Sequence, residues 1–186
     1  MRHRPLRYVA VTVVCATISM TCSKSPTDRF TQKIPEAKKV VLLEGLPHQF
    51  YESELLASES RNKSTIEIDG FPFYEEPLPV SEEDTRQLTK VLSKPETLLP
   101  FRGEKKCGGF HPDYAVEWYV DDQKQTALIC FGCGEIVILN HDGKSRHDLD
   151  SETKQKLRTL LERYEKNRPR NKSPEMLNGY RQNQKD

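Results

Sequence analysis

The chain has 186 residues, of which 31% are charged and 35% hydrophobic, and its 29 basic and 28 acidic residues leave a net charge of +1. This length suits one ordinary domain. The near-neutral balance provides no overall positive field, so the composition argues against a nucleic-acid-binding protein.

Residues 1–22 are expected to form a secretory signal. Basic residues at positions 2–7 precede an uncharged apolar segment of 13 residues, Tyr8 to Met20. That segment is too short to cross a bilayer and has the length of a signal peptide. Cys22 stands where a bacterial lipoprotein carries its lipidated cysteine, and cleavage nearby without lipidation is the alternative. We therefore expect an exported protein, either periplasmic or held at the membrane by a lipid on Cys22.

The remainder divides into one domain between two polar ends. Residues 23–37 are rich in Ser, Pro, Thr and Lys, which predicts a flexible tether. Residues 167–186 are dominated by polar side chains that cannot bury a core, which predicts a disordered tail. Residues 38–166 remain, and they suffice for a single small core.

The first half of this domain contains five predicted elements. We expect strands at 40–43 and 65–68, an extended edge at 71–74, and helices at about 50–59 and 81–92. The strands follow from β-branched and alternating apolar residues, and the helices from apolar side chains at helical spacing. Ser81 is expected to cap the second helix with its hydroxyl group. The three acidic residues that follow it also favour a helix start, because negative charge in the first turn suits the helix dipole. Pro72 has no N–H to donate, which places residues 71–74 at an edge.

The second half is predicted to be mainly β. We expect strands at 115–120, 126–129 and 135–139, joined by turns at 121–124 and 130–134. Apolar side chains at helical spacing after Ser151 predict a last helix. The fold class is therefore α+β: a small antiparallel sheet, made of a three-strand C-terminal meander and N-terminal strands, packed with about three helices.

Three cysteines and a histidine cluster within this domain. Cys107 and His111 lie in a glycine-rich stretch, and Cys130 and Cys133 form a CxxC pair. The hairpin over residues 115–129 returns the chain to its starting edge, so the four side chains are expected to meet. Structural zinc sites use four such ligands in a tetrahedron. One prediction is therefore a zinc site formed by Cys107, His111, Cys130 and Cys133.

A disulfide is the main alternative, because exported proteins meet oxidising conditions. Cys107 could pair with Cys130 or Cys133, which would leave one thiol in the domain. Zinc binding requires His111 to face the sulfur atoms, whereas a disulfide does not. A redox role for the CxxC pair is a third interpretation, although a strand follows the motif where thioredoxin-like sites have a helix. The last alternative is that the cysteines are small buried residues at a crowded turn.

Four motifs of the domain stand out by their length. They are Glu44-Gly-Leu-Pro-His48, Gly70-Phe-Pro-Phe-Tyr74, Lys106-Cys-Gly-Gly-Phe-His-Pro-Asp-Tyr114 with Glu117-Trp118, and Cys130-Phe-Gly-Cys133-Gly-Glu135. Together they resemble an uncharacterised family of small exported bacterial proteins that includes lipoproteins, over about residues 40–165. The resemblance implies relatives of similar size and export route and assigns no catalytic residue. Gly134 follows the CxxC where covalent haem attachment needs a histidine, so haem is not supported.

The function expected from these features is binding or structural support in the cell envelope, without catalysis. No phosphate-binding loop, HExxH or GxSxG motif is present in the sequence. We expect the domain to bind an envelope partner or ligand that the sequence does not identify. The alternative is a thiol redox or metal-dependent enzyme that uses Cys130 and Cys133. His48 is expected to be an exposed turn residue.

Overall fold

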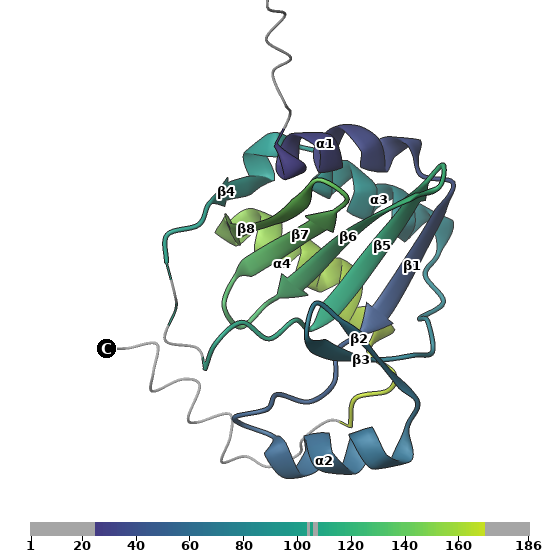
Figure 1. Ribbon diagram of the computed structural model, residues 1–186, viewed down its shortest axis with the longest axis vertical. Helices are drawn as coiled ribbons and strands as arrows, with labels where there is room; N and C mark the ends of the chain where they lie inside the picture. Colours follow the sequence, from purple (N-terminus) through teal and green to yellow (C-terminus); the bar gives the residue numbers. More distant parts are fainter. Residues whose placement is uncertain (1–24, 104, 106–107, 170–186) are drawn as a thin grey trace, which may run out of the picture.

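The computed structural model describes residues 25–103, 105 and 108–169 (Figure 1). Within these residues the helices are α1 (Pro26–Lys33), α2 (Ser53–Asn62), α3 (Glu82–Leu92) and α4 (Ser151–Leu161). The strands are β1 (Lys39–Glu44), β2 (Thr65–Ile68), β3 (Phe71–Tyr74), β4 (Leu98–Pro100), β5 (Tyr114–Val120), β6 (Gln123–Cys130), β7 (Glu135–Asn140) and β8 (Gly143–Leu149). Single 3-10 turns are formed by Ile34–Glu36, Pro95–Thr97 and Glu162–Tyr164. The predicted α+β class is confirmed.

Six strands form one antiparallel sheet in the order β1-β5-β6-β7-β8-β4, and β2 and β3 form a separate hairpin. The predicted meander is present as β5, β6 and β7, and β1 joins it beside β5. The meander continues, however, into a fourth strand, β8, which pairs with the short edge strand β4. β8 lacks an apolar run because most of its residues are polar, and three-residue β4 is too short to show a pattern.

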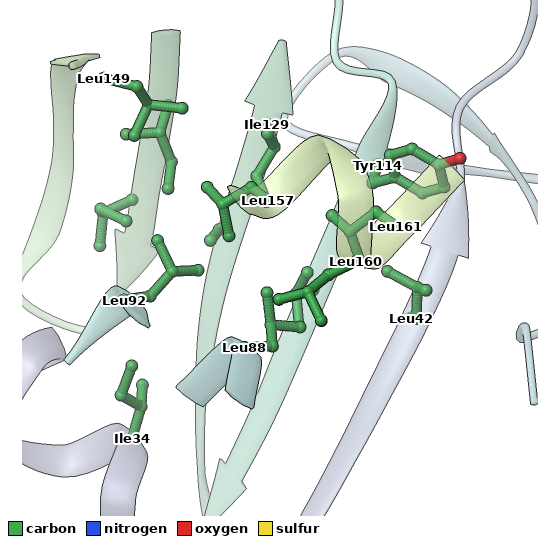
Figure 2. Close-up of a cluster of buried hydrophobic side chains, with 14 of the residues drawn as sticks. Ile34, Leu42, Leu88, Leu92, Tyr114, Ile129, Leu149, Leu157, Leu160 and Leu161 are labelled. Carbon is green, nitrogen blue, oxygen red and sulfur yellow. The ribbon is translucent and has the colours of Figure 1, made fainter. Parts of the chain in front are cut away.

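The main core lies between the sheet and the helices α1, α3 and α4 (Figure 1). Figure 2 shows how leucines of α3 and α4 lie over the strands. The labelled side chains are Leu88 and Leu92 of α3, Leu157, Leu160 and Leu161 of α4, Ile34 of the turn after α1, and Leu42, Tyr114, Ile129 and Leu149 of the sheet. The cap predicted at Ser81 is confirmed, since its Oγ accepts the Asp84 N–H at 3.1 Å. Burial of apolar surface in this core favours folding by about 25 cal/mol per Å².

Helix α1 occupies the segment whose composition predicts a flexible tether. Ser25 begins the helix with a capping box, in which its Oγ accepts the Asp28 N–H and the Asp28 carboxylate accepts the Ser25 N–H. Phe30 and Ile34 lie four residues apart and are 0% and 1% exposed. The Phe30 ring meets Trp118 of β5 edge-on, with 5.5 Å between the ring centroids. The domain therefore starts at about residue 25 rather than 38.

The opposite face of the sheet is covered by the β2–β3 hairpin. Phe73 of β3 is fully buried against Leu43, Ala115, Leu128 and Val137 of the sheet. Helix α2 lies below this hairpin in Figure 1. The Tyr74 hydroxyl donates to the Glu59 carboxylate at 2.9 Å and so links α2 to the hairpin.

Candidate functional site

The motif segments meet at one end of the sheet, where β1 ends, β5 begins and β6 ends. The register pairs Glu44 with Tyr114, and Tyr114 with Ile129. Just beyond β1, the Gly45 N–H donates to the Asp113 carbonyl at 2.8 Å. A Cβ on Gly45 would lie 2.1 Å from the Pro112 carbonyl oxygen, so this close approach of two chain segments requires glycine.

One cysteine of the CxxC pair is a free thiol and the other is part of a disulfide. Cys130 is a free, buried thiol at the end of β6, and the Cys133 N–H donates to its sulfur at 3.2 Å. Cys133 is disulfide-bonded. The two sulfur atoms are therefore not joined to each other. Burial, reinforced by the charge of Asp113, raises the pKa of the Cys130 thiol to about 11, which leaves almost no thiolate at neutral pH.

Cys107 lies outside the described residues, so its place in the predicted cluster is not described. The nearest described residues are Gly108 and Gly109, and the Gly109 carbonyl oxygen lies 3.2 Å from the Cys133 sulfur. Gly109 therefore lies against the CxxC turn. No set of three or more His, Cys, Asp or Glu side chains in the described part of the chain is placed to hold a metal ion. The four-ligand zinc site stays a prediction.

His111 contacts another histidine and an arginine. Its ring lies 4.5 Å from the ring of His48, centroid to centroid, and its Nε2 lies 3.4 Å from Arg168 Nη2. Both rings are buried, which corrects the expectation that His48 is an exposed turn residue. His48 Nδ1 accepts the Phe50 N–H at 3.1 Å. Burial, with the nearby charges of Arg168 and His48, lowers the pKa of His111 to about 3, so its ring is neutral at physiological pH.

Arg168 and Glu44 form a network that the sequence pattern does not reveal. The Arg168 guanidinium donates to the Gly45 carbonyl at 3.0 and 3.2 Å and to the Leu46 carbonyl at 2.8 Å, and it pairs with Asp113 at 3.2 Å. The buried Glu44 carboxylate accepts the backbone N–H groups of residues 166–168 at 2.7 to 3.2 Å. Residues 167 and 168 therefore belong to the fold, although composition places them in a disordered tail. An isolated arginine in a polar segment carries no periodic signal that could have identified it.

A cavity of about 240 Å³ opens beside this network. Its lining residues are Glu44, Asp113, Tyr114, Phe131, Gly132, Arg158, Glu162, Glu165 and Arg168. Asp113 is fixed from two sides, because its Oδ2 accepts the Phe131 N–H at 2.7 Å and its Oδ1 pairs with Arg168. The Arg158 guanidinium lies over the Phe131 ring, 5.3 Å from its centroid. The cavity thus combines two aromatic rings with charges of both signs.

A second charged cluster supports the loop before β5. Glu135 of β7 is fully buried and pairs with Arg146 of β8 at 2.5 Å and with Lys105 at 3.3 Å. The Arg146 guanidinium lies over the rings of Phe101 and Phe110, at 4.4 and 5.2 Å from their centroids. Because Phe110 precedes His111, this cluster holds the histidine loop against the sheet. Its charges are paired within the fold, and we assign it a structural role.

The buried histidines predict a loss of stability in mild acid. The pKa of His111 is lowered from 6.5 to about 3, and the pKa values of His48 and His147 are also lowered, mainly by burial. As the pH falls, these histidines take up protons at a higher pH in the unfolded chain than in the folded one. The stability that comes from their neutral, buried rings is therefore complete above pH 6.5 and falls as the pH drops toward 3. For His111 the loss amounts to about 2 kcal/mol at about pH 5.

Chemical denaturation at neutral pH and at about pH 5 tests this expectation, with His111→Gln as the comparison. The free energy of unfolding of the variant should change less between the two pH values than that of the parent protein. An equal pH dependence in both proteins would show that His111 does not titrate as inferred.

The chain was also compared with known proteins. The family resemblance drawn from the four motifs stays a prediction. Neither the protein-family models, nor the curated proteins, nor the solved structures contain a match to this chain.

Proposed function

We propose that this chain is an exported, non-enzymatic binding domain whose ligand meets the end of the sheet where the cavity lies. The observation that carries the proposal is the cavity itself. It is lined by residues of the Glu44, Asp113 and Phe131 motif segments together with Arg158 and Arg168. A concave site with a few fixed polar groups is the usual form of a small-molecule binding site.

The state of the cysteines argues against the alternative of a thiol redox enzyme. A redox CxxC needs an accessible thiol that ionises near neutral pH. Cys130 is only 3% exposed, and burial raises the pKa of its thiol to about 11. Cys133 is bonded to a sulfur other than that of Cys130. These features suit a cross-link that stiffens the turn between β6 and β7.

We propose Cys107 as the partner of Cys133. The proximity of Gly109 to the Cys133 sulfur supports this pairing, which is one of the two disulfides predicted for Cys107. A cross-link between positions 107 and 133 closes a loop that includes β5 and β6, and such a link contributes about 3 kcal/mol in the chain-entropy account.

Thiol reactivity separates the binding domain from the enzyme. The native protein, treated with Ellman's reagent, is expected to release almost no colour, and one thiol per domain should react after denaturation. Cys130→Ser should remove that thiol. The native protein should also fail to accelerate the reduction of insulin by dithiothreitol. A native thiol that reacts at once, together with catalytic turnover of insulin, would overturn the proposal in favour of the redox enzyme.

We also propose that the protein is exported, and that it is either released into the periplasm or attached to the membrane by a lipid on Cys22. No helix in the described ranges is long and apolar enough to span a membrane. In Figure 1, α1 lies at the top of the sheet, whereas the end of β1 and helix α2 lie at the bottom. A chain anchored ahead of α1 would therefore present the cavity away from the anchored end. Intact mass spectrometry of protein from its native host tests this, and a full-length, unmodified mass would contradict it.

A further inference from the structure

We propose that the cavity binds a small zwitterion, a molecule with one carboxylate and one amino group, such as a free amino acid. The inference rests on the proposed binding function and assigns its ligand class. It is drawn from the positions of charge around the cavity, from the unused donors of Arg158, and from the size of the space.

The inner wall of the cavity is rigid and negative. Glu44 is almost fully buried and is held by the three backbone N–H groups of residues 166–168. Asp113 is held by the Phe131 N–H and by Arg168. Each carboxylate oxygen has two lone pairs, so these groups keep acceptor capacity after making their internal bonds. A ligand ammonium group is the donor that suits this wall.

Arg158 supplies the positive side. Its Nη2 lies 3.5 Å from the Phe131 carbonyl oxygen, which is a long contact, and its Nε forms an ion pair with Glu162 Oε1 at 3.2 Å but no hydrogen bond. These interactions, with the Phe131 ring, are the ones that Arg158 makes within the described residues. Most of its five N–H donors are therefore available, and a guanidinium binds a carboxylate through two parallel hydrogen bonds.

The placement of charge favours a ligand that carries both signs. Four carboxylates and two guanidinium groups line the cavity; Arg168 is engaged by Asp113 and by two carbonyls, and Arg158 pairs through its Nε with Glu162. A simple anion that reached Arg158 would also face the Glu44 and Asp113 carboxylates, and a simple cation would face the Arg158 guanidinium. A zwitterion can place its carboxylate at Arg158 and its ammonium at the inner wall.

The volume of the cavity limits the ligand to a small molecule. A space of about 240 Å³ holds the liquid volume of about eight water molecules. Typical sites for drug-sized ligands start at about 300 Å³. The cavity therefore suits a single amino acid rather than a long peptide. Phe131 and Tyr114 provide apolar contact for a side chain between the two charged ends.

Thermal denaturation with defined probes tests the proposal. L-alanine, L-serine and L-lysine are the zwitterionic probes, and acetate and ethylamine, at the same concentration and ionic strength, are the singly charged controls. At least one amino acid should raise the melting temperature, because a ligand that binds only the folded state stabilises it. Acetate and ethylamine should leave the melting temperature unchanged.

Two variants assign the effect to the cavity. Arg158→Met should weaken amino-acid binding at least about tenfold, the loss expected when a charge-assisted contact worth about 1.4 kcal/mol is removed. Arg86→Met is the matched control, because Arg86 is an exposed arginine of α3 outside the cavity. This variant should bind the probes as the parent protein does. Circular dichroism of both variants checks that they are folded.

Three results would overturn the zwitterion assignment. They are the absence of a shift with every amino acid, a shift of equal size with acetate or ethylamine, and a shift that Arg158→Met leaves unchanged. Each of these leaves the thiol measurements untouched. The melting-temperature shifts therefore decide whether the ligand is a zwitterion. The thiol and insulin assays decide separately between the binding domain and the redox enzyme.

Discussion

Replacement of Phe30 by alanine is expected to lower the free energy of unfolding by about 3–5 kcal/mol, the usual cost of removing a buried phenylalanine. The side chain is fully buried and meets Trp118 of β5 edge-on. Its loss would leave a cavity beneath α1 that rigid neighbouring strands could fill only in part. Urea or guanidinium denaturation, followed by circular dichroism, measures the difference.

Phe50→Ala is the matched control for this experiment. Phe50 is 67% exposed, so the same chemical change should alter stability by less than about 0.5 kcal/mol. Equal effects of the two substitutions would contradict the placement of α1. A small effect of Phe30→Ala alone would support instead the flexible tether that the composition of residues 23–37 predicts.

Replacement of Arg168 by methionine should cost about 2–3 kcal/mol, because it leaves buried acceptors without their donor. The side chain donates to the carbonyls of Gly45 and Leu46 and pairs with Asp113. Methionine preserves most of the apolar stem, so the loss reports on the guanidinium contacts. Denaturant titration gives the change in stability.

Arg86→Met serves as the control for Arg168→Met as well. Arg86 forms an exposed pair with Glu83 on α3, and such pairs contribute little. If residues 167–186 were a disordered tail throughout, both substitutions would be neutral. A neutral Arg168→Met would therefore contradict the contacts of the guanidinium with Gly45, Leu46 and Asp113.

The central elements could be predicted because their residues carry strong local patterns. Strands β5 to β7 combine apolar and β-branched residues, and α3 has a serine cap followed by acids. β8 and α1 were not predicted, for a common reason. Each buries only a few side chains in an otherwise polar segment, and tertiary contacts decide the structure there. At α1 the signal is reduced to Phe30 and to Ile34, which follows the last residue of the helix and lies one helical turn beyond Phe30.

The candidate site was predicted in part. The motif segments that contain Glu44, Asp113 and Cys130 were identified by their residues, and the hairpin of β5 and β6 brings their ends together. The contributions of Arg158 and Arg168 could not be foreseen, because charged residues on a helix face or in a polar tail are ordinarily solvated. Burial of His48 likewise depends on contacts with His111 and Tyr51 that no local pattern reveals.

Peptide mapping of the cysteines tests the central claim most directly. The claim is that the CxxC pair is a fixed part of a binding domain rather than a redox centre. Native protein is treated with iodoacetamide, denatured, treated with a second alkylating reagent of different mass, and digested without reduction. We predict that Cys130 carries only the second label and that Cys133 is found in a disulfide, with Cys107 as its partner. A disulfide between Cys130 and Cys133, or Cys130 labelled in the native protein, would contradict the account.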